Sequence, residues 1–203
     1  MRLFYPHQLI ASSVKKLFVT ITAILSSISL AWAQYSFALD KLHTSVQFRV
    51  KQAGKDLING RFNQFEGTLS YDPEDLSTAR LDFKIKVQSI NTNNQEWDQL
   101  LKKPQFFNAG QHPEISFKST RFQAKGRKIL VSGQLRIQNI TKEVTFEAKD
   151  TGVRGVQQDG YRKGFVANGK IKRSDFNLKY GLKEGLFDDE VEFFVFAAYV
   201  QGK

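Results

Sequence analysis

Apolar residues recur at every second position in six segments of this chain, and this two-residue period constrains the fold more than any other feature. Successive side chains of a β-strand point to opposite faces, whereas a helix repeats every 3.6 residues. In one segment Leu81, Phe83, Ile85 and Val87 alternate with polar residues. The same pattern runs through residues 45–50, 65–71, 129–137, 144–149 and 165–171. Such segments are typical of antiparallel strands with one buried and one solvent-exposed face.

Short polar connections separate these segments, with turn residues at 72–75, 125–127, 139–142 and 158–160. Regular spacing and short connections favour an up-and-down barrel or a sandwich over βαβ units. The chain has room for about eight such strands, and a closed barrel of eight leaves an interior that side chains fill or that holds one small ligand. The sequence therefore predicts an all-β fold.

One segment departs from the two-residue period, and we predict a short helix there, from about residue 93 to 103 and stopped by Pro104. Its apolar residues, at i, i+3 and i+4, form one stripe: Trp97, Leu100 and Leu101. Phe106 and Phe107 follow at once. The stripe is either part of a solid core or the lid of an apolar cavity, and the pattern leaves both interpretations open.

The first 33 residues have the pattern of a signal peptide, with a basic start, an apolar run over 17–30 and a small-x-small site at Ala31-Trp32-Ala33. The competing interpretation is a membrane anchor, but residues 17–33 lie at the short end of the spanning range and carry five Ser or Thr. We predict cleavage near Ala33 and a bacterial periplasmic or secreted barrel domain over residues 34–203.

The charge of the chain after residue 33 is 27 Lys and Arg against 20 Asp and Glu, a net +7. Such a balance steers anionic partners such as lipid headgroups, or serves solubility alone. Export argues against nucleic acid as a partner. The last strand, residues 191–200, is apolar on both faces from Phe193 onward. Either a chain segment covers its outer face or a second copy does, as a homodimer through Phe194, Phe196 and Ala198.

Groups able to do chemistry are few, since the chain has no Cys and three His. No nucleophile elbow, phosphate loop or metal-ligand cluster is present in the sequence. The acidic triplet 188–190 is interpreted as a solvated turn rather than a Ca²⁺ site. A structural ion pair is expected within the run Arg173-Ser174-Asp175, and His43 is expected to hydrogen-bond near Asp40 at the end of the barrel. The sequence predicts no catalysis, no metal and no cofactor other than a bound lipid. A lipid hydrolase or isomerase, the enzymatic alternative, would have only His43, Asp98 and Asp175 as acid or base.

Several segments, in order along the chain, together resemble the YceI family of periplasmic, polyisoprenoid-binding proteins. They are residues 35–48, 60–67, 89–92, 106–120, 133–142, 173–176 and 189–191. The sequence departs from the family pattern in the helix, where an Arg and a His are missing, and at Asn177, where glycine is usual. The resemblance implies a lipocalin-like, eight-stranded antiparallel barrel with one short helix between strands, holding a long amphiphilic lipid such as a polyprenyl or quinone-like chain.

We therefore expect a protein that binds and carries or stores an isoprenoid-type lipid in an apolar cavity. The predicted lining residues are Phe48, Phe62, Phe65, Phe83, Phe117, Leu135, Phe165, Leu101, Phe106 and Phe107. Predicted contacts to the lipid head group, or to the rim, are His43, Asp98, Lys102 and Arg173. The alternative is an interaction module, or a protein associated with the outer membrane through surface contact, whose barrel is packed solid and takes no small ligand.

Overall fold

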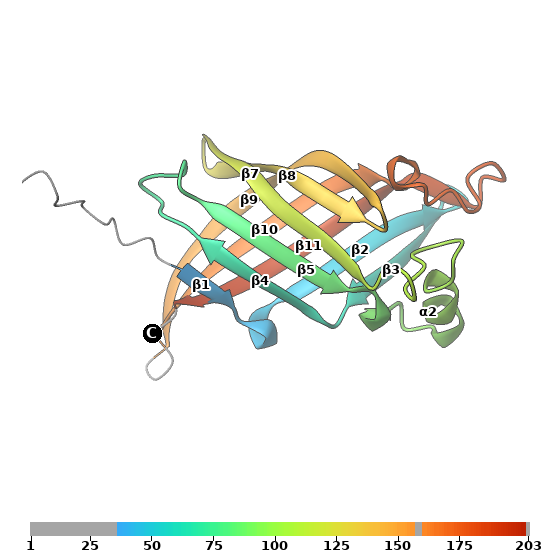
Figure 1. Cartoon of the computed structure of the whole chain (residues 1–203), viewed down its shortest axis with the longest axis horizontal. Helices are drawn as coiled ribbons and strands as arrows, with labels where there is room; N and C mark the ends of the chain where they lie inside the picture. Colours follow the sequence, from blue (N-terminus) through green and yellow to red (C-terminus); the bar gives the residue numbers. More distant parts are fainter. Residues whose placement is uncertain (1–35, 157–159, 202–203) are drawn as a thin grey trace, which may run out of the picture. The chain divides into compact units, whose positions relative to one another are not determined.

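The computed structural model describes residues 36–156 and 160–201, so the predicted signal peptide lies outside the described residues. Strands form almost the whole of this part (Figure 1). Their bounds are β1 Ser36–Leu39, β2 Ser45–Gln52, β3 Asp56–Phe62, β4 Phe65–Ser70, β5 Arg80–Lys86, β6 Ile90–Asn91, β7 Glu114–Lys125, β8 Lys128–Ile137, β9 Ile140–Val156, β10 Gly160–Lys172 and β11 Phe187–Gln201. The helical elements are α2 Gln95–Leu101 and the short 3-10 turns η1 Lys41–His43, η2 Val87–Ser89 and η3 Arg173–Phe176.

These strands close into a barrel, as the sequence predicts. Antiparallel neighbours follow the order β1-β4-β5-β7-β8-β9-β10-β11, and β11 pairs back onto β1, with Phe37 opposite Gln201. The remaining strands continue three of these eight. β2 pairs with β11, as β1 does, and so continues β1; β3 pairs with β2 and continues β4; β6 pairs with β3 and continues β5. Three of the eight wall strands are thus each broken into two pieces. Closure leaves no open sheet edge among the eight strands of the ring.

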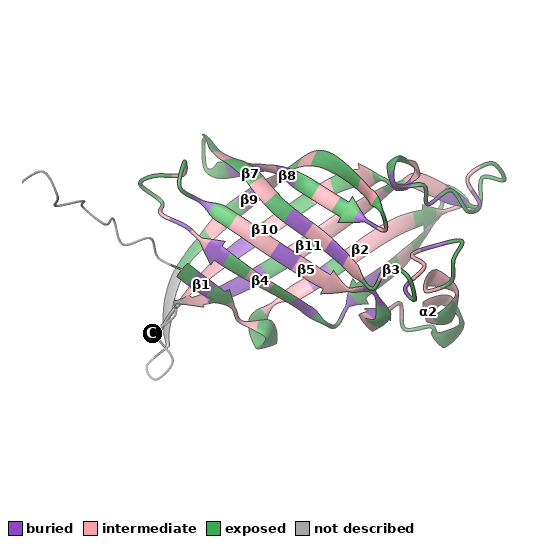
Figure 2. Ribbon diagram, viewed as in Figure 1, coloured by how far each residue is buried: buried purple, intermediate pink, exposed green. Residues whose placement is uncertain are grey.

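Burial alternates along the strands as the two-residue period predicts (Figure 2). In β8, Ile129, Val131 and Ile137 are buried while Gln134 and Arg136 are exposed. The predicted turn at 139–142 is wrong by two residues: the hairpin turn is Gln138-Asn139, and β9 begins at once with Ile140. Gln138 takes a left-handed φ of 55°, which suits the tight two-residue hairpin turn at that position.

Helix α2 is shorter than predicted, at seven residues, and it lies beside one end of the barrel (Figure 1). The Asn94 side chain caps it by accepting hydrogen bonds from the N–H groups of Glu96 and Trp97, at 3.0 and 3.2 Å. The loop after η3 and the β2–β3 hairpin lie at the same end, where the Ala53 N–H donates to the Leu186 carbonyl at 3.0 Å. Over the ranges that the structure describes, no helix has the length and apolar character needed to cross a membrane.

Asn177, which stands where the family pattern has glycine, adopts a left-handed conformation with φ 60° after η3. Asn is the non-glycine residue that tolerates this region best, because its short polar side chain can hydrogen-bond locally. The turn therefore keeps its geometry: the Asn177 N–H donates to the Ser174 carbonyl at 3.0 Å.

Candidate ligand-binding cavity

An elongated cavity of about 280 Å³ runs inside the barrel, from the α2 end to the distal parts of β10 and β11. Eleven of the chain's 18 phenylalanines are on its wall, together with aliphatic residues from the inward face of the strands. Among the described residues of the wall, Gln47 and Arg173 are the two whose side chains carry an amide or a charge. The barrel therefore offers an apolar interior, and the prediction of a solid barrel in the alternative hypothesis is not met.

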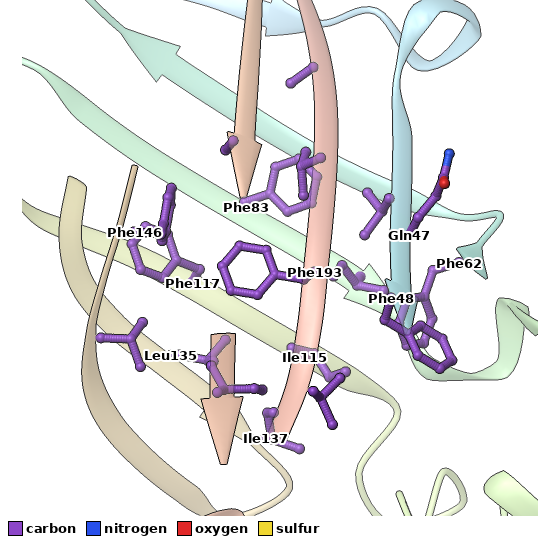
Figure 3. A pocket seen from close by; sticks show the side chains of 18 of the residues that line it. Gln47, Phe48, Phe62, Phe83, Ile115, Phe117, Leu135, Ile137, Phe146 and Phe193 are labelled. Carbon is purple, nitrogen blue, oxygen red and sulfur yellow. The ribbon is translucent and has the colours of Figure 1, made fainter. Parts of the chain in front are cut away.

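Aromatic rings from several strands pack against one another around this interior, at tilted or edge-on angles. The centroid of the Phe146 ring lies 5.1 Å from that of Phe117 and 5.7 Å from that of Phe193. Figure 3 shows these three rings gathered from β9, β7 and β11, with Phe48 and Phe62 forming a second group. Phe48 and Phe62 lie 5.6 Å apart, centroid to centroid. Tilted and edge-on contacts of this kind hold the rings in fixed positions, so the wall is rigid.

Glycine gives these rings room to lie against the wall instead of across the lumen. Three inward glycines lie directly opposite a phenylalanine of the adjacent strand, and a fourth lies diagonal to one: Gly60 with Phe48, Gly67 with Phe83, Gly169 with Phe193, and Gly133 with Phe117. A Cβ on Gly60 would lie 2.2 Å from Phe48 Cζ, and one on Gly169 would lie 2.6 Å from Phe193 Cζ. No side chain fits at either glycine unless the ring moves.

Aromatic contacts close the α2 end of the cavity. Trp97 of α2 meets Phe187 of β11 edge-on at 5.5 Å between ring centroids, and Phe106 meets Tyr180 at 4.8 Å. The Gln138 side chain also donates a hydrogen bond to the Phe106 carbonyl. Trp97 and Phe106 are both on the cavity wall. The helical segment thus covers one end of the cavity, which is the position that a lid would need, while its opening stays a prediction.

The side chain of Arg173 holds the loop at this end by hydrogen bonds to the backbone carbonyls of the loop. Its guanidinium donates to four carbonyls, those of Leu178 at 2.7 Å, Tyr180 at 2.8 Å, Asp188 at 2.9 Å and Phe187 at 3.0 Å. Burial lowers the pKa of Arg173, against the raising effect of two nearby carboxylates. These carbonyl acceptors replace the ion pair predicted within residues 173–175, which is a correction. With four of its five N–H donors engaged, Arg173 is a structural clamp, although it reaches the cavity wall.

The acidic triplet 188–190 is likewise corrected, because it belongs to β11 and is not a solvated turn. Asp189 accepts hydrogen bonds from the Ser174 N–H at 2.8 Å and from the Ser174 hydroxyl at 2.7 Å. Burial alone would raise the pKa of Asp189. The two bonds from Ser174, with the charges of Arg173 and Lys172, outweigh burial and hold that pKa below its usual value. The triplet thus ties η3 to the barrel.

Nine of the ten predicted lining residues are on the cavity wall, and one is not. The nine are Phe48, Phe62, Phe83, Phe117, Leu135, Phe165, Leu101, Phe106 and Phe107. Phe65 is buried but lies off the wall, because its ring stacks on Phe83 at 6.1 Å and that ring separates it from the lumen. That the nine contact a ligand remains a prediction.

Three of the four predicted rim residues do not reach the cavity wall, as far as the described residues form it. His43 is half exposed and its Nδ1 lies 2.9 Å from Asp40 Oδ2, the expected hydrogen bond. Asp98 accepts from both the N–H and the hydroxyl of Thr92, each at 2.7 Å. Lys102 ends α2. Arg173 alone of the four is on the wall.

Sequence reasoning missed several wall residues, and the reason differs between them. Phe146 and Phe193 occupy inward positions of alternating strands, so the two-residue period could have found them. Trp97 could not be found in that way, because it reaches the wall from a helix. Phe187 begins β11 ahead of a shift in register and lies outside the predicted last strand, residues 191–200. Tyr199 lies on the inward face of β11, where its strand position indicates that it is buried but not that its ring contacts Phe165.

The outer face of β11 is apolar in part, and it is covered in part. Ala198 is buried, and its N–H donates a hydrogen bond to the hydroxyl oxygen of Thr44, next to η1, at 3.1 Å. Phe194 and Phe196 are 38% and 46% exposed, beside Val166 at 37%. Ala198 therefore does not belong to an exposed patch, which corrects one residue of the predicted interface. A homodimer through Phe194 and Phe196, and contact with a membrane surface, stay predictions.

Comparison with known proteins agrees with this architecture. A family model described as the YceI-like domain matches residues 37–197. A UPF0312 protein of Yersinia enterocolitica is 34% identical over 171 residues, covering 84% of this chain and 88% of the relative. A UPF0312 protein of Pectobacterium atrosepticum is 33% identical over 181 residues, covering 88% and 94%.

Solved structures show the same fold. The Campylobacter jejuni YceI protein is 27% identical, with a TM-score of 0.63 over 72% of this chain and 85% of that one. BcnA of Burkholderia cenocepacia is 23% identical, with a TM-score of 0.71 over 79% and 98%. A polyisoprenoid binding domain from Saccharophagus degradans is 15% identical, with a TM-score of 0.65 over 83% and 99%. The last two likenesses concern the fold alone.

Proposed function

The chain belongs to the YceI-like family, and from this premise we propose that its barrel binds a long amphiphilic isoprenoid-type lipid, polyprenyl or quinone-like, which it carries or stores. The observation that carries the proposal is the apolar cavity along the barrel, lined by eleven phenylalanines. A cavity of about 280 Å³ is close to the lower end of the range for small-molecule sites. A slender chain suits it better than a bulky ring system.

Desolvation supplies the driving force for such a complex. Removing apolar surface from water gains about 25 cal/mol per Å², so each buried methylene contributes about 0.8 kcal/mol. Part of this gain in free energy is offset by the conformational and translational entropy that the ligand loses on binding. The loss of conformational entropy in the protein is small, because the wall is rigid before the ligand binds. No reacting group is needed for this mechanism.

The isoprenoid class is the first to test because the Saccharophagus degradans domain with this fold is described as polyisoprenoid binding. The enzymatic alternative finds little support, since neither His43 nor Asp98 nor Asp175 is among the described residues of the cavity wall. Asp98 is also engaged by Thr92. The described residues of the cavity wall therefore include none of the three predicted acid or base groups that an enzyme acting on a bound lipid would use.

Native mass spectrometry with lipid extraction tests the proposal on protein purified gently from its own cell envelope. We expect a long-chain lipid at one molecule per barrel. Ala167→Phe adds a ring to the cavity wall and should empty the barrel of lipid. Asn168→Phe places the same ring at the next, outward-facing position of β10 and should leave the barrel loaded. A wild-type barrel without lipid, or equal loading of the two variants, would count against the proposal.

Export completes the proposal, since the sequence of residues 1–33 has the pattern of a signal peptide. We propose a periplasmic or secreted protein. N-terminal sequencing of the exported chain should begin at Gln34. Retention of residues 17–30 on the chain in the membrane fraction would show an anchor instead.

A further inference from the structure

Polar side chains gather at the end of the barrel opposite to α2. Lys163 lies near the start of β10, directly across the ladder from Tyr199 of β11. Its Nζ lies 3.0 Å from Asp150 Oδ2 and 4.6 Å from the centroid of the Tyr71 ring. The Tyr71 hydroxyl donates to the same Asp150 oxygen at 3.3 Å. Lys163 and Arg173 are ten positions apart along the chain, which corresponds to about 33 Å in an extended strand.

Tyr199 is the member of this group that reaches the cavity wall. Its side chain is 3% exposed, and its ring meets Phe165 edge-on at 6.1 Å between centroids. Among the described residues its hydroxyl has no hydrogen-bond partner, whereas buried tyrosine hydroxyls ordinarily find one. Burial raises the pKa of Tyr199, so the group stays protonated and able to donate. The hydroxyl is thus placed to donate a hydrogen bond to an acceptor atom of a ligand in the cavity.

The charges at this end set the chemistry of that acceptor. Lys163 is compensated by Asp150, and its side chain is only 12% exposed. The pair therefore leaves no uncompensated positive charge for a phosphate. At the other end of the cavity, backbone carbonyls engage four of the five N–H donors of Arg173, and the carboxylates of Asp188 and Asp189 lie close enough to act on its charge. Among the side chains that the structure describes on the cavity wall, none is therefore a cation left free for an anionic head group.

We propose that the β10–β11 end of the cavity is a head-group subsite, in which the Tyr199 hydroxyl donates a hydrogen bond to a neutral oxygen acceptor of the lipid. The acceptor is a carbonyl, ether or hydroxyl oxygen at the inner end of the chain, and Phe165 packs beside it. The ion pair of Lys163 and Asp150 backs this site without touching the ligand. The inference rests on the proposed lipid-binding function and adds the direction in which the lipid lies, head away from α2.

Three probes of equal chain length test it: octadecane, octadecan-2-one and octadecyl phosphate, each delivered from cyclodextrin to delipidated full-length mature protein. Their affinities are measured by displacement of a fluorescent hydrocarbon. Wild-type protein should bind the ketone about five- to tenfold more tightly than the alkane, since one buried hydrogen bond is at stake. Tyr199→Phe should bind the alkane as before and lose the preference for the ketone. Tyr180→Phe, at the opposite end and 42% exposed, is the matched control and should keep that preference.

The outcomes separate the subsite from the function on which it rests. A Tyr199→Phe variant that still prefers the ketone would place the head group elsewhere. Phosphate binding as tight as ketone binding would overturn the neutral character of the site. Equal binding of alkane and ketone by wild-type protein would overturn the subsite alone, while failure to bind any probe would overturn the lipid-binding function as well. Urea unfolding of both variants shows whether they fold, and the carbonyl ¹³C shift of labelled ketone reports its hydrogen bond directly.

Discussion

Replacement of Gly60 by alanine should push the ring of Phe48 into the cavity. The added Cβ would lie 2.2 Å from Phe48 Cζ and 2.5 Å from Cε1, and within 4 Å it would meet only atoms of that ring as its nearest neighbours. Carbon atoms in contact lie about 3.5–4.0 Å apart, so the ring must move by about 1.3 Å or more. Because the strand backbone lies on one side of the ring and the lumen on the other, the ring can only move inward.

The effect on stability and the effect on binding have different sizes. Overpacking typically costs about 1–3 kcal/mol. Alanine restricts the unfolded chain and returns about 0.4–1 kcal/mol, because the φ of Gly60 is one that alanine can adopt. We expect a net loss of about 1–2 kcal/mol in the free energy of unfolding. If the displaced ring excludes two methylene groups of the ligand, binding weakens by about 1.6 kcal/mol, or roughly fifteenfold.

Urea unfolding and ligand titration measure the two effects. Gly110→Ala is the control, since no atom lies within 4 Å of its added Cβ; it should leave the affinity unchanged and raise the free energy of unfolding by at most about 0.4–1 kcal/mol. Adding Phe48→Leu to Gly60→Ala shortens the obstructing side chain and should recover much of the binding, which a double-mutant cycle reports as coupling. A Gly60→Ala variant with wild-type stability and affinity would refute the idea that glycine keeps the ring against the wall.

Three further outcomes are expected. Arg173→Lys should lower the free energy of unfolding by about 3–5 kcal/mol in urea melts, because an ammonium cannot replace the donors to four separate carbonyls; a loss below about 1 kcal/mol would contradict the clamp. The folded-state pKa of Asp189 is lowered, so its contribution to stability is complete above the unfolded pKa, near pH 4, and is lost as the pH falls through the lower folded value. Asp189→Asn should therefore flatten the acid limb of the stability–pH curve, and an unchanged limb would show that Ser174 does not matter to it. Leu101→Ala should increase the release rate of a bound polyene lipid while lowering the free energy of unfolding only slightly. An unchanged release rate with a large loss of stability would show that α2 is part of the hydrophobic core and not a lid.

The sequence determines which residues face inward and that the fold is a barrel or sandwich of antiparallel strands. Phe83 and Phe117 lie inside because the side-chain period of a strand is two, which is a local property of the chain. The helix could be placed, to within two residues at each end, from its stripe, its cap and Pro104. For the same reason nine of the ten residues predicted to line the cavity are on its wall, while their contact with a ligand stays a prediction. Phe65 was misplaced, because parity says which face a residue occupies and not which neighbour covers it.

Tertiary structure alone decided closure, partners and the two ends of the cavity. The pairing of Phe37 with Gln201 joins residues at opposite ends of the part of the chain that the structure describes, and no local pattern encodes that register. Arg173 was expected to pair with the carboxylate of Asp175, two positions away, but it binds carbonyls five to fifteen residues further on, which only the folded loop brings together. The buried hydroxyl of Tyr199 depends on neighbours from other strands in the same way. The face to which a side chain points follows from its position in the strand, whereas the residues that it contacts depend on the pairing of distant strands. For that reason the wall of the cavity could be outlined from the sequence, but the residues at its two ends could not.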